Sequence, residues 1–280
     1  LCIVCARCVR ACDEIRGDLA LAMTERSGQV LVGTSMGDSL LEAGCEFCGA
    51  CIDVCPVGAL TETDYKWERP ARIEQSVCSN CPVGCQMTYE VNEWERVIRV
   101  IPELNAPANF GQACFKGKFG FKYVNDKRRI REPMLRTPNG LEKVSWDEAF
   151  REAEEQLKLY NSNEFAILIA HKATNEDLYM AQKFSRVVME SNSIDSPGNT
   201  RPGMLEGIYE VLNCYSGTNP ISDLAISKTV LMVGSNVTEE QNVLAIPIKQ
   251  AVRSGHQTLI VIDSREVEMT RYASLWLRPY

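Results

Sequence analysis

The pattern of apolar and polar positions is clearest from Ser145 onward. Ser145 and Glu148 have the spacing of a capping box, in which each side chain bonds the backbone amide of the other residue at a helix start. Apolar side chains then recur every three or four residues, which predicts an amphipathic helix. These side chains are Trp146, Ala149, Phe150, Ala153, Leu157 and Tyr160.

The segment after this helix is predicted to continue as a strand and a second helix. Residues 165–170 form a short apolar run that is typical of a buried strand, and residues 175–190 have helical spacing. Residues 197–203 contain two prolines and two glycines, which indicates a looser connection.

A strand, a helix and another strand follow in the last part of the chain. Residues 229–233 and 258–262 are apolar and β-branched, and residues 239–254 between them have helical spacing. Pro247 is expected to start or kink this helix, because its ring removes an amide donor and clashes one turn back. Gly255 suits the helix end. This order predicts a βαβ unit with parallel strands.

The first half of the chain differs in character. Residues 1–65 show little helical periodicity beyond short turns, and the next segment contains strand-like pieces at 87–91 and 96–101. We therefore predict three domains, with the boundaries 1–65, 66–135 and 136–280.

Composition narrows the classes of function. The net charge of −7 argues against a nucleic-acid partner, because phosphate binding needs a basic surface. No apolar run approaches the roughly 20 residues that span a bilayer, so we expect no membrane insertion. The chain begins at Leu1 rather than at Met, directly before a cysteine, and we expect the natural N-terminus to lie upstream.

Thirteen cysteines are the main chemical feature of the chain. A secreted disulfide scaffold is usually short and poor in regular structure, whereas the last part of this chain has an ordinary α/β pattern. A cytoplasmic, reducing location with thiolates as metal ligands fits better.

Eight of the cysteines form two runs spaced Cys-x2-Cys-x2-Cys-x3-Cys. This is the bacterial ferredoxin run, in which the fourth cysteine of each run ligates the cluster of the other run. The spacing lets a tight turn aim the sulfurs at one cubane while amides of the turn donate to them. Zinc is the alternative, but its sites use cysteine pairs rather than complete runs of four. The first predicted cluster is held by Cys2, Cys5, Cys8 and Cys55, and the second by Cys12, Cys45, Cys48 and Cys51.

A third set of four cysteines has the spacing Cys-x2-Cys-x3-Cys with a distant fourth member. Alone this is a moderately specific metal pattern, but directly after two ferredoxin runs it indicates a third [4Fe–4S] cluster, with zinc as the alternative. Cys214 is left over, and we expect it to be a buried structural thiol. The predicted ligands of the third cluster are Cys78, Cys81, Cys85 and Cys114.

These cysteines and several flanking motifs resemble the start of a molybdopterin oxidoreductase large subunit. The chain is most similar to the alpha subunit of NAD-linked, cytosolic formate dehydrogenases. The large iron–sulfur subunit of respiratory NADH dehydrogenase is a relative that typically lacks a complete second run. The motifs are Cys114-Phe115-Lys116-Gly117, Pro133-Met134-Leu135-Arg136, Val144-Ser145-Trp146-Asp147-Glu148-Ala149, Cys8-Val9-Arg10-Ala11-Cys12-Asp13-Glu14 and Cys45-Glu46-Phe47-Cys48-Gly49-Ala50-Cys51.

The resemblance implies a fold and a set of partners. It implies an α+β two-cluster ferredoxin-like domain, a small β-rich [4Fe–4S] domain and an incomplete α/β parallel-sheet (Rossmann-like) domain for molybdopterin guanine dinucleotide with Mo or W. It also implies an upstream [2Fe–2S] segment, a long C-terminal half, and partner subunits that carry flavin and iron–sulfur clusters.

The resemblance also implies roles for residues outside the cysteine sets. Lys116 matches the lysine between cluster and pterin, and a solvated lysine is the alternative. Two strand ends match contacts to the nucleotide, although such residues are common in ordinary turns. These strand-end residues are Gly234, Ser235, Asn236, Asp263 and Arg265.

One segment departs from the family pattern. Arg201 matches the arginine beside the metal ligand and is, with Lys116, our catalytic candidate. Gly203 stands where the family has a cysteine or selenocysteine ligand, and Met204 stands where formate dehydrogenases usually have histidine. Glycine has no side-chain atom that could ligate a metal, which argues against formate oxidation.

Two functions from different classes therefore remain open. The first is an electron-transfer subunit of a formate-dehydrogenase-type oxidoreductase, with electrons passing from a pterin-bound metal to a flavin partner. The second is a non-catalytic relay and scaffold with a vestigial pterin site, which the glycine at position 203 favours. A zinc-stabilised binding module is a third and more distant hypothesis.

Overall fold

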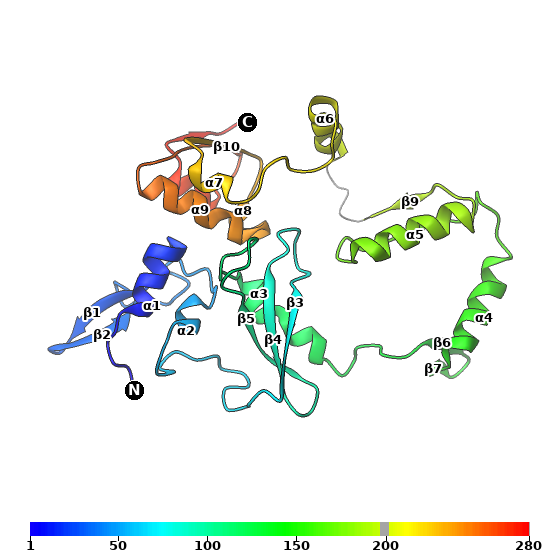
Figure 1. Cartoon of the computed structure of the whole chain (residues 1–280), viewed down its shortest axis with the longest axis horizontal. Coiled ribbons are helices and arrows are strands. Elements are labelled where there is room, and N and C mark those ends of the chain that lie inside the picture. Colours follow the sequence, from blue (N-terminus) through cyan, green and yellow to red (C-terminus); the bar gives the residue numbers. More distant parts are fainter. Residues whose placement is uncertain (197–201, 280) are drawn as a thin grey trace. The chain divides into compact units, whose positions relative to one another are not determined.

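The structure is a computed structural model that describes residues 1–196 and 202–279 (Figure 1). The chain divides into two units by its internal contacts. The cysteine-rich unit comprises Leu1–Asn125 with Thr218–Tyr280, and the inserted unit comprises Asp126–Gly217.

The first part of the cysteine-rich unit consists of very short helices and one hairpin. Ser27 and Gly28 at the hairpin turn both have positive φ, of 53° and 74°, which matches the twist of a two-residue β-hairpin. The elements are α1 (Arg7–Arg10), the π-helix η1 (Ala11–Arg16), β1 (Ala22–Arg26), β2 (Gln29–Gly33) and α2 (Ala50–Asp53).

A three-stranded antiparallel sheet follows in the same unit. Its central and last strands coincide with the two strand-like pieces predicted from the sequence, so that prediction is confirmed. Ile98 and Val100 alternate with more exposed neighbours and have no exposed surface, which places one face of the sheet against the core. The elements are β3 (Arg72–Val77), β4 (Gln86–Val91), β5 (Val97–Pro102), α3 (Phe115–Phe119) and the 3-10 helix η2 (Gly120–Asn125).

The last part of the cysteine-rich unit is a three-stranded sheet in which neighbouring strands are parallel. The predicted strands and their parallel pairing are confirmed. Leu259, Val261 and Met269 have no exposed surface and form the centre of the core beside this sheet. The elements are α7 (Asp223–Ile226), β10 (Thr229–Val233), α8 (Val237–Glu240), α9 (Asn242–Arg253), β11 (Thr258–Ile262), the 3-10 helix η3 (Glu268–Tyr272) and β12 (Leu275–Leu277).

The helix predicted between these strands is divided. Gln241 has φ −138° and ψ 57°, which are not helical, and it separates α8 from α9. Pro247 lies inside α9 rather than at its start. Gly255, with φ +74°, follows the helix and donates its amide to Val252 O at 3.0 Å, as the sequence predicts for a helix end.

The inserted unit contains one hairpin, one short parallel pair and three helices among its described residues. Two of the helices begin with capping boxes, at Ser145 as predicted and at Thr174. No helix in residues 1–196 and 202–279 has the length and apolar character of a bilayer-spanning segment. The elements are β6 (Met134–Thr137), β7 (Gly140–Lys143), α4 (Trp146–Leu157), β8 (Ile167–Leu168), α5 (Asn175–Val187), β9 (Ile194–Asp195) and α6 (Pro202–Leu212).

One prediction for the inserted unit is wrong. The run 165–170 forms only a two-residue strand, because β8 pairs with β9 over two residues alone, and Leu168 is 77% exposed. Most of the segment expected to be loose, residues 197–201, lies outside the described residues, and α6 begins at Pro202, where the fixed φ of proline suits the first helical position. The predicted apolar face of α4 is present but exposed, at 63% for both Trp146 and Phe150.

Candidate metal centres

The two ferredoxin runs build the same backbone turn. The third residue of each run, Val4 and Phe47, lies in the left-handed region, with φ of 54° and 53°. Each of these residues donates its amide to the first cysteine of its run, at 3.4 Å to Cys2 Sγ and 3.3 Å to Cys45 Sγ. Neither residue is glycine, so the turn follows from the cysteine spacing and the amide-to-sulfur bond rather than from backbone freedom.

The next left-handed residue in each run begins the short helix after it. Ala6 precedes α1 with φ 60°, and Gly49 precedes α2 with φ 80°. At Gly49 a Cβ atom would lie 2.8 Å from Cγ of the buried Lys118, closer than real contacts allow. Glycine is therefore required at position 49 both by backbone conformation and by packing.

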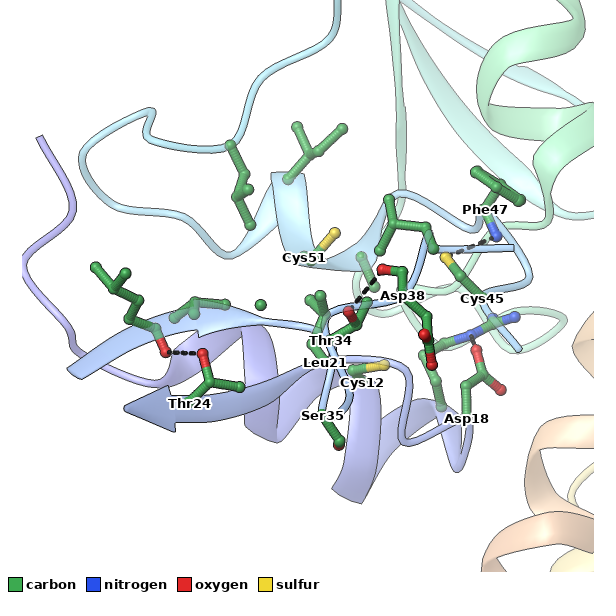
Figure 2. Close-up of a pocket in the computed structure, with 18 of the residues that line it drawn as sticks. Cys12, Asp18, Leu21, Thr24, Thr34, Ser35, Asp38, Cys45, Phe47 and Cys51 are labelled. Atoms are coloured by element: carbon green, nitrogen blue, oxygen red, sulfur yellow. Dashed lines mark hydrogen bonds and ion pairs between the residues drawn. The ribbon is translucent and has the colours of Figure 1, made fainter. Parts of the chain in front are cut away.

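The second predicted ligand set surrounds a cavity of about 800 Å³, and Figure 2 shows three of its members around this space. The cavity lies between α2, the β1–β2 hairpin and the loop after β2. Burial, followed by the nearby thiols, raises the pKa of Cys51 to about 12. The cysteines that line the cavity are Cys12, Cys45, Cys48 and Cys51.

This donor set fits a metal cluster. Every cysteine of the chain is a free thiol. Buried thiols with a raised pKa stay protonated at neutral pH unless a cation replaces their protons, and a coordinating metal does this. Four sulfurs that converge on one cavity, with an amide directed at Cys45, match the way proteins hold a [4Fe–4S] cubane.

The first predicted ligand set is more open. Cys2 and Cys5 are exposed, and Cys8 is buried. Burial, with a smaller contribution from the other two thiols, raises the pKa of Cys8. Cys55 lines a cavity of about 410 Å³ with Arg7 and Arg10 of α1, and Cys2, Cys5 and Cys8 do not line it. Backbone amides, chiefly that of Leu60, lower the pKa of Cys55. Cys55 is thus placed beside α1, as the crossed ligand pattern requires.

The third predicted ligand set is gathered between the antiparallel sheet and α3. Cys78 donates its amide to Cys85 O at 2.8 Å, and Gly117 donates its amide to Cys114 Sγ at 3.4 Å. Burial and the three other thiols raise the pKa of Cys85 to about 12. The four cysteines line one cavity: Cys78, Cys81, Cys85 and Cys114.

Lys116 lines the same cavity as this third set. Its Nζ donates to Glu239 O at 2.9 Å, near the end of α8. The side chain therefore lies between a predicted cluster and the segment that follows β10. The side chain is exposed, so this contact does not decide between a cofactor role and a solvated lysine.

The strand-end residues are brought to one edge of the parallel sheet, because β10 and β11 are neighbours. Gly234 has φ +56°, and nothing lies within 4 Å of where its Cβ would be. Asp263 is buried, and its Oδ1 accepts the amide of Arg265 at 2.9 Å. The Asp263 carboxylate thus stabilises its own turn, whereas the Arg265 side chain is 74% exposed.

The segment that departs from the family pattern is only partly described. Arg201 lies outside the described residues. Gly203 lies in α6 of the inserted unit, is exposed, and has open space around the position of a Cβ. Cys214 is half-buried, with its thiol 3.6 Å from Ser216 O, so the expectation of a buried thiol is wrong.

A buried ionic network that sequence reasoning missed joins the ferredoxin runs to α9. Arg16 Nη2 donates to Glu46 Oε2 at 2.6 Å. Lys249 Nζ donates to Asp18 and Glu268, each at 3.0 Å, and also to Glu46. Neither cation has more than 1% of its side chain exposed.

The carboxylates of this network hold a lysine rather than a metal ion. Oxygens of Asp18, Glu46 and Glu268 lie within 4.8 Å of one another, and the Lys249 ammonium bonds all three. Burial lowers the pKa of Lys249, but the carboxylates outweigh burial and hold this pKa above its usual value. The sequence gives one signal for this network, because Glu46 lies inside a cysteine run. It gives no signal that Lys249 belongs to the network.

Three protein-family models match consecutive parts of the chain. Residues 1–61 match the NADH-quinone oxidoreductase subunit 3, ferredoxin-like domain. Residues 71–126 match the molybdopterin oxidoreductase Fe4S4 domain, and residues 129–279 match molybdopterin oxidoreductase.

Curated proteins match over the whole chain. An NADH-quinone oxidoreductase subunit of Rhizobium meliloti is 32% identical over 100% of this chain and 32% of its own length. NADPH-Fe(3+) oxidoreductase subunit alpha of Geobacter sulfurreducens is 29% identical over 99% of this chain and 33% of its own length. The chain thus spans about a third of the length of these relatives.

A solved structure shares the fold. Acetylene hydratase from Pelobacter acetylenicus superimposes with a TM-score of 0.60 over 72% of this chain and 29% of its own, at 21% sequence identity.

Proposed function

Because the chain belongs to the molybdopterin oxidoreductase family, we propose that it is an iron–sulfur electron-transfer subunit of a larger oxidoreductase. The observation that carries this proposal is the gathering of eight cysteines of one unit around two cavities, each lined by one complete predicted set of four. When bound, each [4Fe–4S] cluster supplies one-electron transfer.

The protein's own groups prepare these sites for a cluster. Amides of Val4, Phe47 and Gly117 donate to ligand sulfurs, which stabilises thiolate over thiol. Partial burial of Cys48 and Cys51 in the second site, and of Cys81 in the third, limits their contact with water. The first site, with Cys2 and Cys5 exposed, is suited to exchange electrons with a partner.

The finer proposal is a formate-dehydrogenase-type assembly in the cytoplasm. A pterin-bound metal would face the third site, and a flavin- and NAD-linked partner would face the first. Lys116, beside the third site, and the strand-end residues Gly234 and Arg265 would hold the pterin nucleotide. They offer two cations, and Gly234 offers an open backbone at the edge of the parallel sheet. Gly203 does not fit a metal ligand.

Iron and acid-labile sulfide analysis of the anaerobically purified protein tests the relay. We expect about twelve irons and twelve sulfides per chain, from three cubanes. Cys48→Ser should lose about four irons, whereas Cys214→Ser, outside the three sets, should lose none. A colourless protein that contains zinc instead would overturn the proposal.

The second candidate is a relay that lacks a working pterin–metal centre, and the glycine at position 203 favours it. Molybdenum and tungsten analysis, with extraction of guanine dinucleotide, separates the two candidates. Formate-dependent reduction of a viologen dye then tests the substrate. Metal and nucleotide in stoichiometric amounts would reject the second candidate, and their absence from an iron-replete protein would reject the first.

A further inference from the structure

Arg16 occupies a buried position between the second and third cysteine sets. Its side chain has no exposed surface, although it is one of the longest and most strongly hydrated side chains. Nη2 bonds Glu46, the residue directly after the ligand Cys45. Nη1 donates to the carbonyl oxygen of Ala113 at 3.2 Å, and Ala113 directly precedes the ligand Cys114.

The guanidinium is fixed in this position by a third partner. Nη2 also donates to Asn242 Oδ1 at 2.6 Å, and Asn242 in turn donates to Glu46 at 2.9 Å. Asn242 is the first residue of α9, so three segments far apart in sequence hold one cation. A charge held this way cannot move away when its surroundings change.

One nitrogen of this guanidinium lacks a partner. Arg16 Nε is buried and has no hydrogen-bond acceptor in the described part of the chain, and the Asp18 carboxylate lies 3.8 Å away. Arg16 lines the cavity of the second cysteine set. Buried donors rarely lack acceptors, and a sulfur of a cluster in this cavity is an acceptor of suitable chemistry.

The charge of Arg16 lies beside the second set in particular. The side chain lines the cavity of this set and bonds Glu46, the residue next to Cys45. A fixed cation in this place stabilises negative charge in the cavity. One-electron reduction adds one negative charge to a cluster without making or breaking a bond, so a fixed cation favours the reduced state.

We propose that Arg16 is a positioning residue that holds a fixed positive charge and an N–H donor against the second cluster and thereby raises its reduction potential. This inference rests on the proposed function, because it requires a cluster at Cys12, Cys45, Cys48 and Cys51.

The test is a redox titration of the complete protein with electron paramagnetic resonance detection. The signal of the second cluster is identified as the one that Cys45→Ser removes. Arg16→Gln should lower the equilibrium constant for reducing this cluster at least tenfold, which is about 59 mV for one electron. Arg16→Lys should recover most of the shift because it keeps the charge. Arg10→Gln removes an exposed arginine from the neighbouring helix and should leave the potential unchanged.

Glu46→Gln keeps the test decisive if Arg16→Gln fails to assemble. This variant leaves Asn242, Asp18 and Glu268 as partners for the two buried cations. Removal of the carboxylate beside Arg16 should raise the potential of the second cluster, opposite in sign to Arg16→Gln. A residue that only supports the fold would change stability without these opposite shifts.

The outcomes separate this inference from the proposed function. A wild-type protein without about twelve irons rejects the function itself. Iron-replete Arg16→Gln with an unchanged second potential overturns the role of Arg16 and leaves the relay intact. If only Glu46→Gln assembles, an unchanged reduction potential of the second cluster in that variant also overturns the role of Arg16.

Discussion

The first and second cysteine sets share a backbone turn but have opposite environments. In both, a left-handed residue donates its amide to the first cysteine of the run. Cys2 and Cys5 of the first set are nevertheless exposed, whereas Cys48 and Cys51 of the second set are half-buried and line a cavity beside a buried arginine. Equal cysteine spacing therefore yields equal turns, and the surrounding structure decides which site is open and which is closed.

Charge distinguishes the two sets in the same way. Arg10 beside the first set pairs with Glu14 on the surface, at side-chain exposures of 69% and 55%. Arg16 and Lys249 beside the second set are buried with their carboxylate partners. Surface pairs are screened by water, and buried pairs are not. The closed site is thus the one where single charges should have large effects.

Replacement of Lys249 should give the largest effect. Lys249→Ala would leave Asp18, Glu46 and Glu268 buried without their ammonium partner, and breaking a buried pair costs about 3–5 kcal/mol. We expect this loss in the free energy of unfolding of the cysteine-rich unit, measured by denaturant titration. Arg10→Ala at the open set is the control and should change stability little. Equal losses in the two variants would contradict the difference between the sets.

Gly49 of the second run should be more sensitive to substitution than Ala6, the equivalent turn residue of the first run. Gly49→Ala adds a Cβ at positive φ and 2.8 Å from Lys118 Cγ, so we expect a loss of about 1–3 kcal/mol in stability. Thermal or chemical unfolding of the holo-protein measures this loss. A neutral result would mean that Lys118 and α2 shift freely, and the closed site would then be less rigid than its packing indicates.

Chelation should remove iron from the open set first. With an iron chelator under mild oxidation we expect a fast phase of about four irons and a slow phase of about eight, from three cubanes. Exposure of Cys2 and Cys5 gives the chelator access, and the rates should differ at least tenfold. Absorbance at the cluster band follows both phases. A single phase would show that exposure of the ligands does not control access.

Substitution in the open set should have the smallest effect. Ala6 already has φ 60°, and Ala6→Gly removes the cost of a left-handed alanine while it makes the unfolded chain more flexible. These effects oppose each other, so we expect a change below about 1 kcal/mol. Parallel unfolding experiments with Gly49→Ala compare the two positions directly. A loss as large as that of Gly49→Ala would show that the open set is packed as tightly as the closed one.

Much of the local structure could be predicted from the sequence. The strands around 229–233 and 258–262, their parallel pairing and the capping box at Ser145 follow from periodicity and local hydrogen bonding. The helix α6 and the short, exposed β8 could not be predicted, because their extent depends on which other segments are beside them. Side-chain burial along α4 depends on packing in the same way.

For the candidate sites, the sequence by itself determined the cysteine sets and the turns that carry them. The spacing within a run fixes which sulfurs and amides can meet within a few residues. Val4 and Phe47 adopt the same left-handed conformation although their side chains differ. Only the tertiary structure decided that Arg16 meets Asn242 and that Lys249 meets Glu46, residues 226 and 203 positions apart. Contacts over such separations exist only when the fold brings the segments together, and the same packing removes the water that would otherwise weaken their charges.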